Sequence, residues 1–308
     1  MNGVSFRPGY LGLHRSGELR SRGEALWEIY RECRLCPREC RVDRIAGEKG
    51  FCQASSTLKV ASYNAHFGEE RPLVGVGGSG TIFLSHCNLG CVFCQNWDIS
   101  HKGSGTEVEI ADLAGMMLQL QEQGCQNINV VTPTHFAPHV VLALDQAAGK
   151  GLRIPLVYNT CGWERSEILA LLEGIVDIYL ADFKYMDGSK SARYSSDADS
   201  YPEITRSALI ETNRQVGVAV AAQNGLIFRG LMIRHLVMPD NVSGSAEAMQ
   251  WISSNLPLDT YVNIMIQYHP AYRAHLFPEI DTYVSREDYM EVVQEARRFG
   301  LVNLDVNA

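Results

Sequence analysis

The feature that most constrains the fold is a regular alternation of short apolar runs and amphipathic segments that begins near residue 81. The apolar runs are typical of buried strands. The segments between them carry apolar residues at helical spacing, as at Leu113, Met116, Met117 and Leu120. This alternation predicts parallel strands joined by right-handed helical crossovers. The predicted fold class is therefore α/β.

Six strands and the helices between them are expected in this part of the chain. The strands are expected at residues 81–85, 127–132, 154–160, 176–183, 231–238 and 261–268. The helices are expected around residues 113–120, 140–144, 164–172, 203–216, 245–256 and 289–296. Six such units favour a partial (β/α)6 barrel over a closed eight-unit barrel. An open doubly wound sheet would give the same alternation.

The first 75 residues have a different texture, with one short amphipathic piece at residues 25–30 and then four closely spaced cysteines. We expect two regions, an N-terminal region with a four-cysteine metal-binding knot at residues 1–75 and the barrel at residues 76–308. Glycines at 75, 77, 78 and 80 precede the first strand rather than follow one, so they do not fit a dinucleotide fingerprint or a P-loop. We expect a flexible loop there.

Composition limits the class of partner. The 308 residues include 27 Lys and Arg against 35 Asp and Glu, and the formal net charge of −8 argues against nucleic acid as a partner. No window approaches the roughly 18 apolar residues of a membrane span, and the N-terminus lacks the apolar core of a secretion signal. We expect a cytoplasmic protein that binds no membrane. Clustered cysteines in that compartment more often hold metal than form disulfides.

Three cysteines after the first strand form the sharpest motif. Cys87, Cys91 and Cys94 have the spacing C-x3-C-x2-C, with Phe93 before the last of them. Three thiolates can bind three corners of a [4Fe–4S] cluster that normally takes four, which leaves one iron open. An open metal position lets a substrate bind the metal directly. Three buried thiols that only pack are the structural alternative.

This motif resembles that of the radical S-adenosylmethionine (SAM) superfamily. Three stretches also resemble its pyruvate formate-lyase-activating-enzyme-like branch: HFGEERP at 66–72, GSGTIFLSHCNLGCVFCQNWDIS at 78–100 and LADFKYM at 180–186. The resemblance extends from about residue 33 to residue 272. It implies a radical SAM partial barrel with a [4Fe–4S] cluster and SAM as cofactors.

The resemblance also implies an activity. Superfamily members cleave SAM reductively at the cluster to a 5′-deoxyadenosyl radical, which abstracts hydrogen from a substrate. The founding activity of the branch is hydrogen abstraction from a glycine of a glycyl radical enzyme. We therefore expect a radical SAM oxidoreductase that acts on a protein, a peptide or a small molecule. A one-electron donor such as flavodoxin or ferredoxin is the implied reductant.

Polar residues at the carboxyl ends of the predicted strands match the family's site. Asp182 and Lys184 match its Asp-Leu-Lys at SAM and the substrate, and an arginine at the position of Arg234 is placed to pair with the SAM carboxylate. The predicted catalytic residues are Asp182, Lys184 and His135. The predicted cofactor-binding residues are Phe93, Thr132, Thr134, Asn159, Thr160, Asp182, Arg234 and Gln267.

One strand end departs from the family pattern. The second strand ends in VVTPTH at 130–135, where superfamily members often carry Gly-Gly-Glu, which bonds the SAM amino group. Thr132, Thr134 or backbone carbonyls would have to replace that contact. His135 is a ligand, a base or a hydrogen-bonded scaffold residue. A buried ion pair is the structural alternative for Asp182 and Lys184.

A second cysteine group lies in the N-terminal region. Cys33, Cys36, Cys40 and Cys52 supply four thiolates, with a proline after the second of them. A closed zinc site and an auxiliary [4Fe–4S] cluster both fit this spacing. The two remaining cysteines, Cys125 and Cys161, are expected to pack in the core, although Cys161 could face the pocket.

Upstream of the barrel, Glu69, Glu70 and Arg71 are not explained by SAM chemistry alone. We hypothesise that this layer covers the mouth of the barrel or binds substrate. The alternative function from another class is a non-catalytic iron–sulfur electron carrier or metal-binding module, which would need the cysteines but not Asp182 or Arg234. A radical SAM enzyme that modifies RNA is a weaker alternative, because no appended basic segment is visible.

Overall fold

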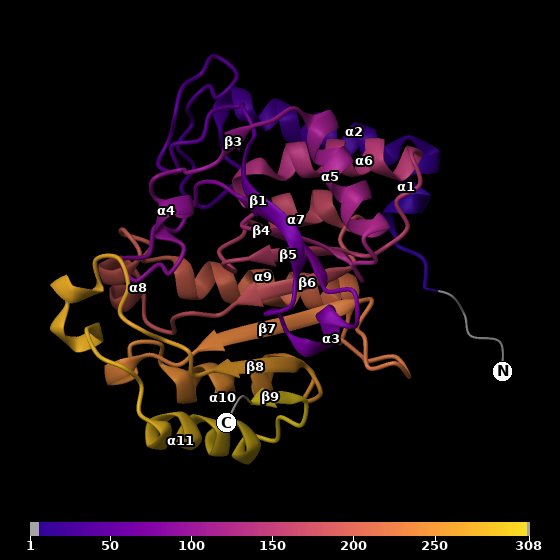
Figure 1. Ribbon diagram of the computed structural model, residues 1–308. Helices are drawn as coiled ribbons and strands as arrows, with labels where there is room; N and C mark the ends of the chain where they lie inside the picture. Colours follow the sequence, from indigo (N-terminus) through magenta and orange to yellow (C-terminus); the bar gives the residue numbers. More distant parts are fainter. Residues whose placement is uncertain (1–5, 307–308) are drawn as a thin grey trace.

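A computed structural model describes residues 6–306, and a nine-stranded sheet runs through it in the order β3-β1-β2-β4-β5-β6-β7-β8-β9 (Figure 1). The strands β2, β4, β5, β6, β7, β8 and β9 pair in parallel. The sheet curves without closing, so the partial α/β barrel predicted from the alternation is confirmed.

All six predicted strands are present, and their ends differ from the predictions by no more than a few residues. They are β2 (Ser79–Leu84), β4 (Ile128–Val131), β5 (Leu156–Thr160), β6 (Ile178–Asp182), β7 (Gly230–Leu236) and β8 (Tyr261–Met265). Most of their residues are buried. Such nearly continuous apolar runs are typical of parallel strands covered on both faces.

Three strands were not predicted. β1 (Lys59–His66) pairs antiparallel with β2, and the two-residue β3 (Thr106–Glu107) pairs antiparallel with β1. β9 (Leu304–Val306) extends the other edge. β1 mixes polar and apolar residues and is mostly half-buried or exposed, and the other two strands are very short. An edge strand of this kind lacks the continuous apolar run by which the central strands are found.

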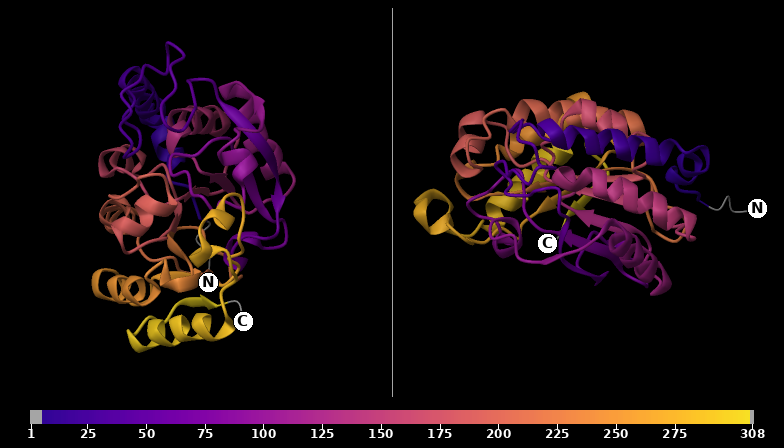
Figure 2. Two further views of the ribbon diagram at one scale, coloured as in Figure 1. Left: turned by 90° about the vertical axis from the view of Figure 1, so that its left-hand side faces the viewer. Right: turned by 90° about the horizontal axis from the view of Figure 1, so that it is seen from above.

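Helices cover the outer face of the curved sheet, and the inner face is turned toward the centre of the molecule (Figure 2). The six predicted helices are α5 (Ile110–Glu122), α6 (Ala137–Gly149), α7 (Ser166–Leu172), α9 (Tyr201–Val216), α10 (Ser245–Asn255) and α11 (Arg286–Arg298). In α11 the hydroxyl of Ser285 accepts the N–H of Asp288 and caps the first turn. Its apolar stripe of Tyr289, Val292 and Val293 is buried.

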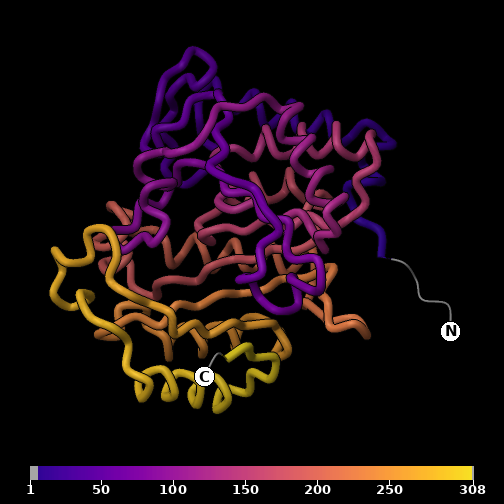
Figure 3. The backbone as a smooth tube through the Cα atoms, in the orientation of Figure 1, coloured from indigo at the N-terminus to yellow at the C-terminus, as the bar shows by residue number. Residues whose placement is uncertain are grey.

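The N-terminal region begins with helices α1 (Tyr10–Ser16) and α2 (Glu18–Glu28), and α2 packs on α6. Only a short piece near residues 25–30 was expected to be helical here. After the 3-10 turn at Ile29–Glu32, residues 33–58 contain no helix or strand. They form the loops at the indigo end of the backbone trace (Figure 3). The division of the chain at residue 75 remains a prediction, and β1 already belongs to the large sheet.

The glycine-rich stretch before β2 is a close-packed turn rather than the flexible loop predicted. A Cβ on Gly77 would lie 1.8 Å from the carbonyl oxygen of Gly124, so no side chain fits there. Gly78 has a positive φ of 81°, and its carbonyl accepts the N–H of Gln126 at 3.0 Å. These glycines let two loops at the amino end of the sheet approach each other.

Residues 66–72 lie at the end of the barrel opposite its mouth. Because β1 is antiparallel to β2, with His66 beside Ser79, the chain leaves β1 where the parallel strands begin. Helix α3 (Arg71–Val74) follows at that end (Figure 1). The carboxylate of Glu70 accepts a hydrogen bond from the Asn263 amide of β8 at 2.9 Å. The expectation that this layer covers the mouth is therefore wrong, and it instead ties β1 to β8.

Candidate active site

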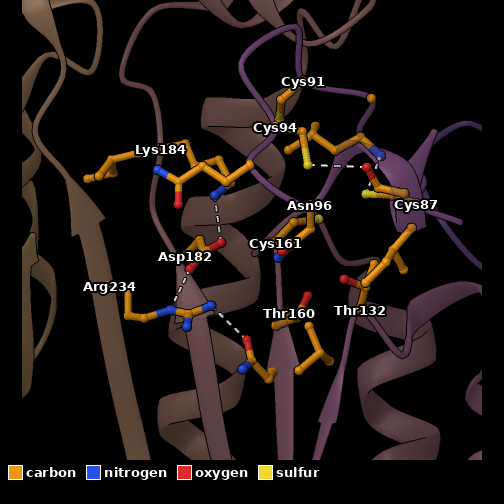
Figure 4. Close-up of a pocket in the computed structure, with 18 of the residues that line it drawn as sticks. Cys87, Cys91, Cys94, Asn96, Thr132, Thr160, Cys161, Asp182, Lys184 and Arg234 are labelled. Carbon is orange, nitrogen blue, oxygen red and sulfur yellow. Dashed lines mark hydrogen bonds and ion pairs between the residues drawn. The ribbon is translucent and has the colours of Figure 1, made fainter. Parts of the chain in front are cut away.

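A cavity of about 280 Å³ opens at the carboxyl ends of the strands, where barrel active sites form. Its size is near the lower end for small-molecule sites. Side chains from the loop after β2 and from the ends of β4, β5, β6, β7 and β8 line it (Figure 4). The predicted residues that it brings together are Cys87, Cys91, Phe93, Cys94, Thr132, Asn159, Thr160, Asp182, Lys184, Arg234 and Gln267.

The three motif cysteines line one side of this cavity. The N–H of Leu89 donates to Cys87 Sγ at 3.4 Å, and the Ser195 hydroxyl donates to Cys91 Sγ at 3.1 Å. Burial raises the pKa of Cys87 to about 11 and that of Cys91 to about 12. Iron binding must therefore displace protons from these thiols, as expected for metal–thiolate ligation. Donors aimed at sulfur suit thiolates, so this arrangement fits a cluster with one open iron.

The opposite side of the cavity carries a buried charge network centred on Asp182. Its Oδ2 accepts from Lys184 Nζ at 2.6 Å and its Oδ1 from Arg234 Nε at 2.7 Å. Arg234 Nη2 also donates to Asn159 Oδ1 at 2.6 Å. The network joins three neighbouring strands, since Asn159 is on β5, Asp182 on β6 and Arg234 on β7. The sheet pairs Asp182 directly with Arg234. The carboxylate thus faces two cations.

This network keeps its members charged inside the protein. Burial opposes ionisation of Asp182, but the charges of Arg234 and Lys184 outweigh it and lower the pKa of the carboxyl. Burial likewise opposes the charge of Lys184, and Asp182 reverses this and raises the pKa of the ammonium group. A pocket with fixed charges of both signs suits a zwitterionic ligand such as the amino-acid part of SAM.

Two residues that line the cavity have a strained backbone. Thr132 has a φ of 56° and His86 a φ of 74°. A β-branched residue in the left-handed region is an outlier, and such strain costs about 1–3 kcal/mol per residue. The N–H of Thr132 donates to the Asn159 carbonyl at 2.8 Å, which fixes the strand end in this conformation. Two of the ten non-glycine residues with positive φ among the described residues thus line this cavity, and strained residues are common at functional sites.

Thr160 is hydrogen-bonded to Glu164, a residue that sequence reasoning missed. Its hydroxyl donates to the carboxylate of Glu164, which also accepts from the Thr134 hydroxyl. Glu164 is only 1% exposed, and burial raises the pKa of its carboxyl to about 7. No motif marks this glutamate, and its role follows only from the turn after β5.

The structure does not bring Thr134 and His135 to the cavity. Both are buried in the short 3-10 turn Thr134–Phe136 after β4. His135 Nε2 lies 2.8 Å from the Ser85 carbonyl oxygen, and burial lowers the pKa of the imidazole to about 3. Of the three roles considered for His135, a neutral histidine bonded to the backbone matches that of a scaffold residue. The site proposed below therefore does not include His135.

Several lining residues were not predicted. They are His86, Gln95, Asn96, Ser100 and Met265, together with apolar neighbours. Cys161 faces the cavity rather than only packing in the core, and its thiol donates to Asn88 Oδ1 at 3.6 Å. Cys125 is buried as expected. Phe93 packs edge-on against Tyr185 and Tyr268 and closes the apolar side of the site.

The second cysteine group forms a separate small cavity. Its lining includes all four thiols, those of Cys33, Cys36, Cys40 and Cys52. Arg44, 1% exposed, lies beside them with Nη1 at 4.0 Å from Cys33 Sγ. Burial opposes the charge of Arg44, but nearby Tyr30, Cys52 and Cys33 outweigh it and raise the pKa of the guanidinium. An anionic metal–thiolate centre would compensate this buried cation.

Within residues 6–306, no three His, Cys, Asp or Glu side chains stand close enough together to hold a single metal ion. The thiolates of a [4Fe–4S] cluster bind different iron atoms, so they need not converge on one point. The same part of the chain contains no helix that could cross a membrane.

The fold and the three-cysteine site define a class of iron–sulfur barrel proteins, and comparison with known families agrees. Residues 81–210 match the model of the radical SAM superfamily. The chain is 32% identical over 286 residues to the uncharacterized protein MJ0674 of Methanocaldococcus jannaschii, covering 89% of this chain and 76% of that protein. The chain therefore belongs to the radical SAM superfamily.

Two more distant similarities cover smaller parts of their proteins. The uncharacterized protein MJ0808 of the same organism is 30% identical over 81 residues, which are 22% of this chain and 24% of that protein. The crystal structure of HydG, a maturase of the [FeFe]-hydrogenase, superposes with a TM-score of 0.50 at 14% identity. It matches 73% of this chain, which spans half the length of HydG. At that identity the likeness shows the fold alone.

Proposed function

We propose that the chain is a radical SAM enzyme of the pyruvate formate-lyase-activating-enzyme-like branch, with its [4Fe–4S] cluster on Cys87, Cys91 and Cys94. One observation carries the proposal: these thiols share a cavity with the charged network of Asp182, Lys184 and Arg234. An electron carrier needs the cysteines but has no use for that network. The alternative of a non-catalytic module is therefore the weaker one.

The bound cluster and SAM would supply the chemistry, a 5′-deoxyadenosyl radical that abstracts hydrogen from a substrate. The chain's own residues would bind and orient the cluster and SAM and would shield them from water. Three thiolates would hold three irons and leave the fourth open for the amino-acid part of SAM. Arg234 and Lys184 offer donors to a carboxylate, and Asn159 and Thr160 offer polar groups to ribose hydroxyls. Gln267 and Thr132 lie on the same rim.

The apolar part of the wall excludes water from this site. Phe93 of the loop after β2, Leu236 of β7 and Met265 of β8 line the cavity. A dry site matters because a carbon radical reacts with whatever it contacts. The proposed substrate, a protein segment, a peptide or a small molecule, would enter from the same mouth. A one-electron donor such as flavodoxin or ferredoxin would reduce the cluster.

The second cavity is proposed as a metal site on Cys33, Cys36, Cys40 and Cys52. Four thiols around one cavity, with the buried Arg44 beside them, support it. An auxiliary [4Fe–4S] cluster, whose thiolates bind different irons, fits this arrangement. A zinc ion is the alternative and would need the thiols to move closer together, because no three such side chains in residues 6–306 converge on one ion. Because residues 33–58 contain no helix or strand, metal binding would stabilise the fold of this segment.

The test is a SAM-cleavage assay on the anaerobically reconstituted chain. The reductant is dithionite, and 5′-deoxyadenosine is measured by mass spectrometry. We expect 5′-deoxyadenosine from the wild type and none from the Cys87→Ala, Cys91→Ala, Cys94→Ala triple variant. Cys125→Ala is the matched control, because Cys125 is buried outside the cavity lining. A triple variant that keeps the full iron content and still cleaves SAM would refute the assignment.

A further inference from the structure

The two cysteine sites are joined by the side chain of Arg38. This residue lies in the turn between Cys36 and Cys40, so its backbone belongs to the N-terminal site. Its guanidinium reaches the loop of the other site. Nε donates to the Asn88 carbonyl at 3.0 Å, and Nη2 donates to the Leu89 carbonyl at 3.1 Å. Both carbonyls lie within the C-x3-C segment.

The same guanidinium holds a second loop that supports the cluster cysteines. It donates to the carbonyl of Ser195 at 3.1 Å and to that of Ser196 at 2.5 Å, just after α8 (Gly188–Tyr194). The hydroxyl of Ser195 in turn donates to Cys91 Sγ at 3.1 Å. One side chain of the N-terminal site thus fixes two loops around the other site. A planar guanidinium with five N–H donors can make such a set, whereas an ammonium group cannot.

Arg38 also contacts an aromatic ring. The guanidinium carbon of Arg38 lies 3.8 Å from the centroid of the Phe51 ring, and the N–H of Phe51 donates to Cys40 Sγ at 3.3 Å. A Cβ on Gly90 would lie 2.9 Å from that ring. Gly90 also has a positive φ of 72°. The motif loop therefore contacts the N-terminal site directly, at a glycine.

The charge of Arg38 acts on both sites. Its guanidinium comes from the Cys36–Cys40 turn and bonds carbonyls of the segment between Cys87 and Cys91, so its positive charge lies close to both groups of thiols. A positive charge held near an iron–sulfur cluster stabilises the more negative, reduced state. Removing that charge should make the cluster harder to reduce.

We propose that Arg38 is a positioning residue that couples the two sites. Metal bound at Cys36 and Cys40 fixes the turn that carries Arg38, and Arg38 then holds the Cys87 loop and makes its cluster easier to reduce. Such coupling is reciprocal, so each site affects the other. This inference rests on the proposed function, because it needs a SAM-binding cluster at Cys87.

The experiment is a potentiometric titration of the reconstituted full chain, followed by electron paramagnetic resonance (EPR). The signal that changes on adding SAM identifies the Cys87 cluster. We expect Arg38→Gln to load as much iron as the wild type but to show a more negative midpoint potential. Arg38→Lys keeps the charge and should lie closer to the wild type. Arg34→Gln is the matched control, since Arg34 is half-exposed and pairs with Glu32.

A second variant tests the direction of the coupling. Removing the metal with Cys36→Ala and Cys40→Ala should shift the same midpoint, and Arg38→Gln should add no further shift in that background. The proposal is overturned if Arg38→Gln matches Arg34→Gln in midpoint and line shape. If Arg38→Gln loads less iron than the wild type, the variant with Cys36→Ala and Cys40→Ala is the deciding test. An unchanged midpoint potential of the Cys87 cluster in that variant overturns the proposal.

The same titration separates the two proposals. A wild-type chain whose EPR signal ignores SAM contradicts the proposed function, and the coupling falls with it. A wild-type signal that responds to SAM, with no shift in the variants, contradicts the coupling alone.

Discussion

Cys87, Cys91 and Cys94 follow a strand in the interior of the nine-stranded sheet, whereas Cys33, Cys36, Cys40 and Cys52 lie in a segment with no helix or strand. The first group is placed by the register of parallel strands, which brings its partners to the same edge. The second lies in a segment attached to the barrel by hydrogen bonds from Arg38 and Arg44 and, as proposed, stabilised by metal. The comparison suggests that one site is built by the fold, while the other helps to build it.

The largest expected difference concerns SAM cleavage. The triple Cys-to-Ala variant at positions 87, 91 and 94 should lose SAM cleavage completely, together with about four iron atoms per chain, because no cluster forms. It should keep most of its stability, since the sheet and not the cluster positions that loop. Iron analysis and thermal unfolding check both parts.

The converse variant replaces Cys33, Cys36, Cys40 and Cys52 by Ala. It should lower the melting temperature by about 5–10 °C, because a few kcal/mol of metal-linked folding energy are lost. Differential scanning calorimetry of the reconstituted proteins measures this. Equal melting temperatures in the two sets of variants would break the comparison between a fold-built and a metal-built site.

A smaller effect is expected from the charge network on the fold-built side. Asp182→Asn removes the shared partner of Lys184 and Arg234, whose side chains are 17% and 19% exposed. Lys184 would lose its ion-pair partner and Arg234 would keep only the more distant charges of Glu69 and Glu70, which should cost roughly 3 kcal/mol of unfolding free energy. Urea unfolding measures the loss. Lys190→Gln, which alters no residue of this network, is the control and should leave stability within about 0.5 kcal/mol.

A pH effect of similar or smaller size is expected at Glu164. Burial raises the pKa of this carboxyl to about 7, above its value near 4.3 in the unfolded chain. The native state then binds more protons, so the contribution of Glu164 to stability falls as pH rises from about 4 through 7, by on the order of 3 kcal/mol. Glu164→Gln should remove this part of the pH dependence.

Urea unfolding at pH 5 and pH 8 compares the two proteins. The variant should lose less unfolding free energy than the wild type over that interval. Burial also raises the pKa of Asp177 and that of Glu69 to about 7, so both proteins keep a residual slope of the same sign. Identical slopes in wild type and variant would contradict the prediction.

The smallest effect is expected at the edge of the contact between the two regions. Glu39 of the N-terminal segment pairs with Arg165 of the barrel, and the Glu39 side chain is 41% exposed. Glu39→Gln should cost less than about 1 kcal/mol and leave SAM cleavage unchanged. A shift of the cluster midpoint potential as large as that from Arg38→Gln would show that general contact, and not Arg38, joins the two regions.

The sequence predicts the barrel and its site better than it predicts the edge strands and the contact between the two regions. The six central strands and the placement of Asp182, Arg234 and Asn159 at one edge follow from apolar runs and alternation, because parallel strands align their carboxyl ends. No periodic pattern in the sequence marks the half-exposed β1 or the very short β3 and β9. The hydrogen bonds of Arg38 to the Cys87 loop likewise leave no pattern in the sequence.

Two errors have physical causes. His135 sits at a strand end, but the chain turns there into a 3-10 turn that buries the imidazole against the Ser85 carbonyl. The segment at 66–72 was expected at the mouth, because a strand that runs antiparallel to the rest could not be inferred from its mixed pattern. Orientation of an edge strand depends on pairing, which sequence periodicity does not report.

The central claim is that SAM binds at the cluster held by Cys87, Cys91 and Cys94. The most direct measurement is the EPR spectrum of the dithionite-reduced chain with and without SAM. The account predicts that SAM changes the spectrum of the wild type and that the triple Cys-to-Ala variant lacks the responding signal. A reduced cluster whose spectrum is identical with and without SAM would contradict the account and would favour the electron-carrier alternative.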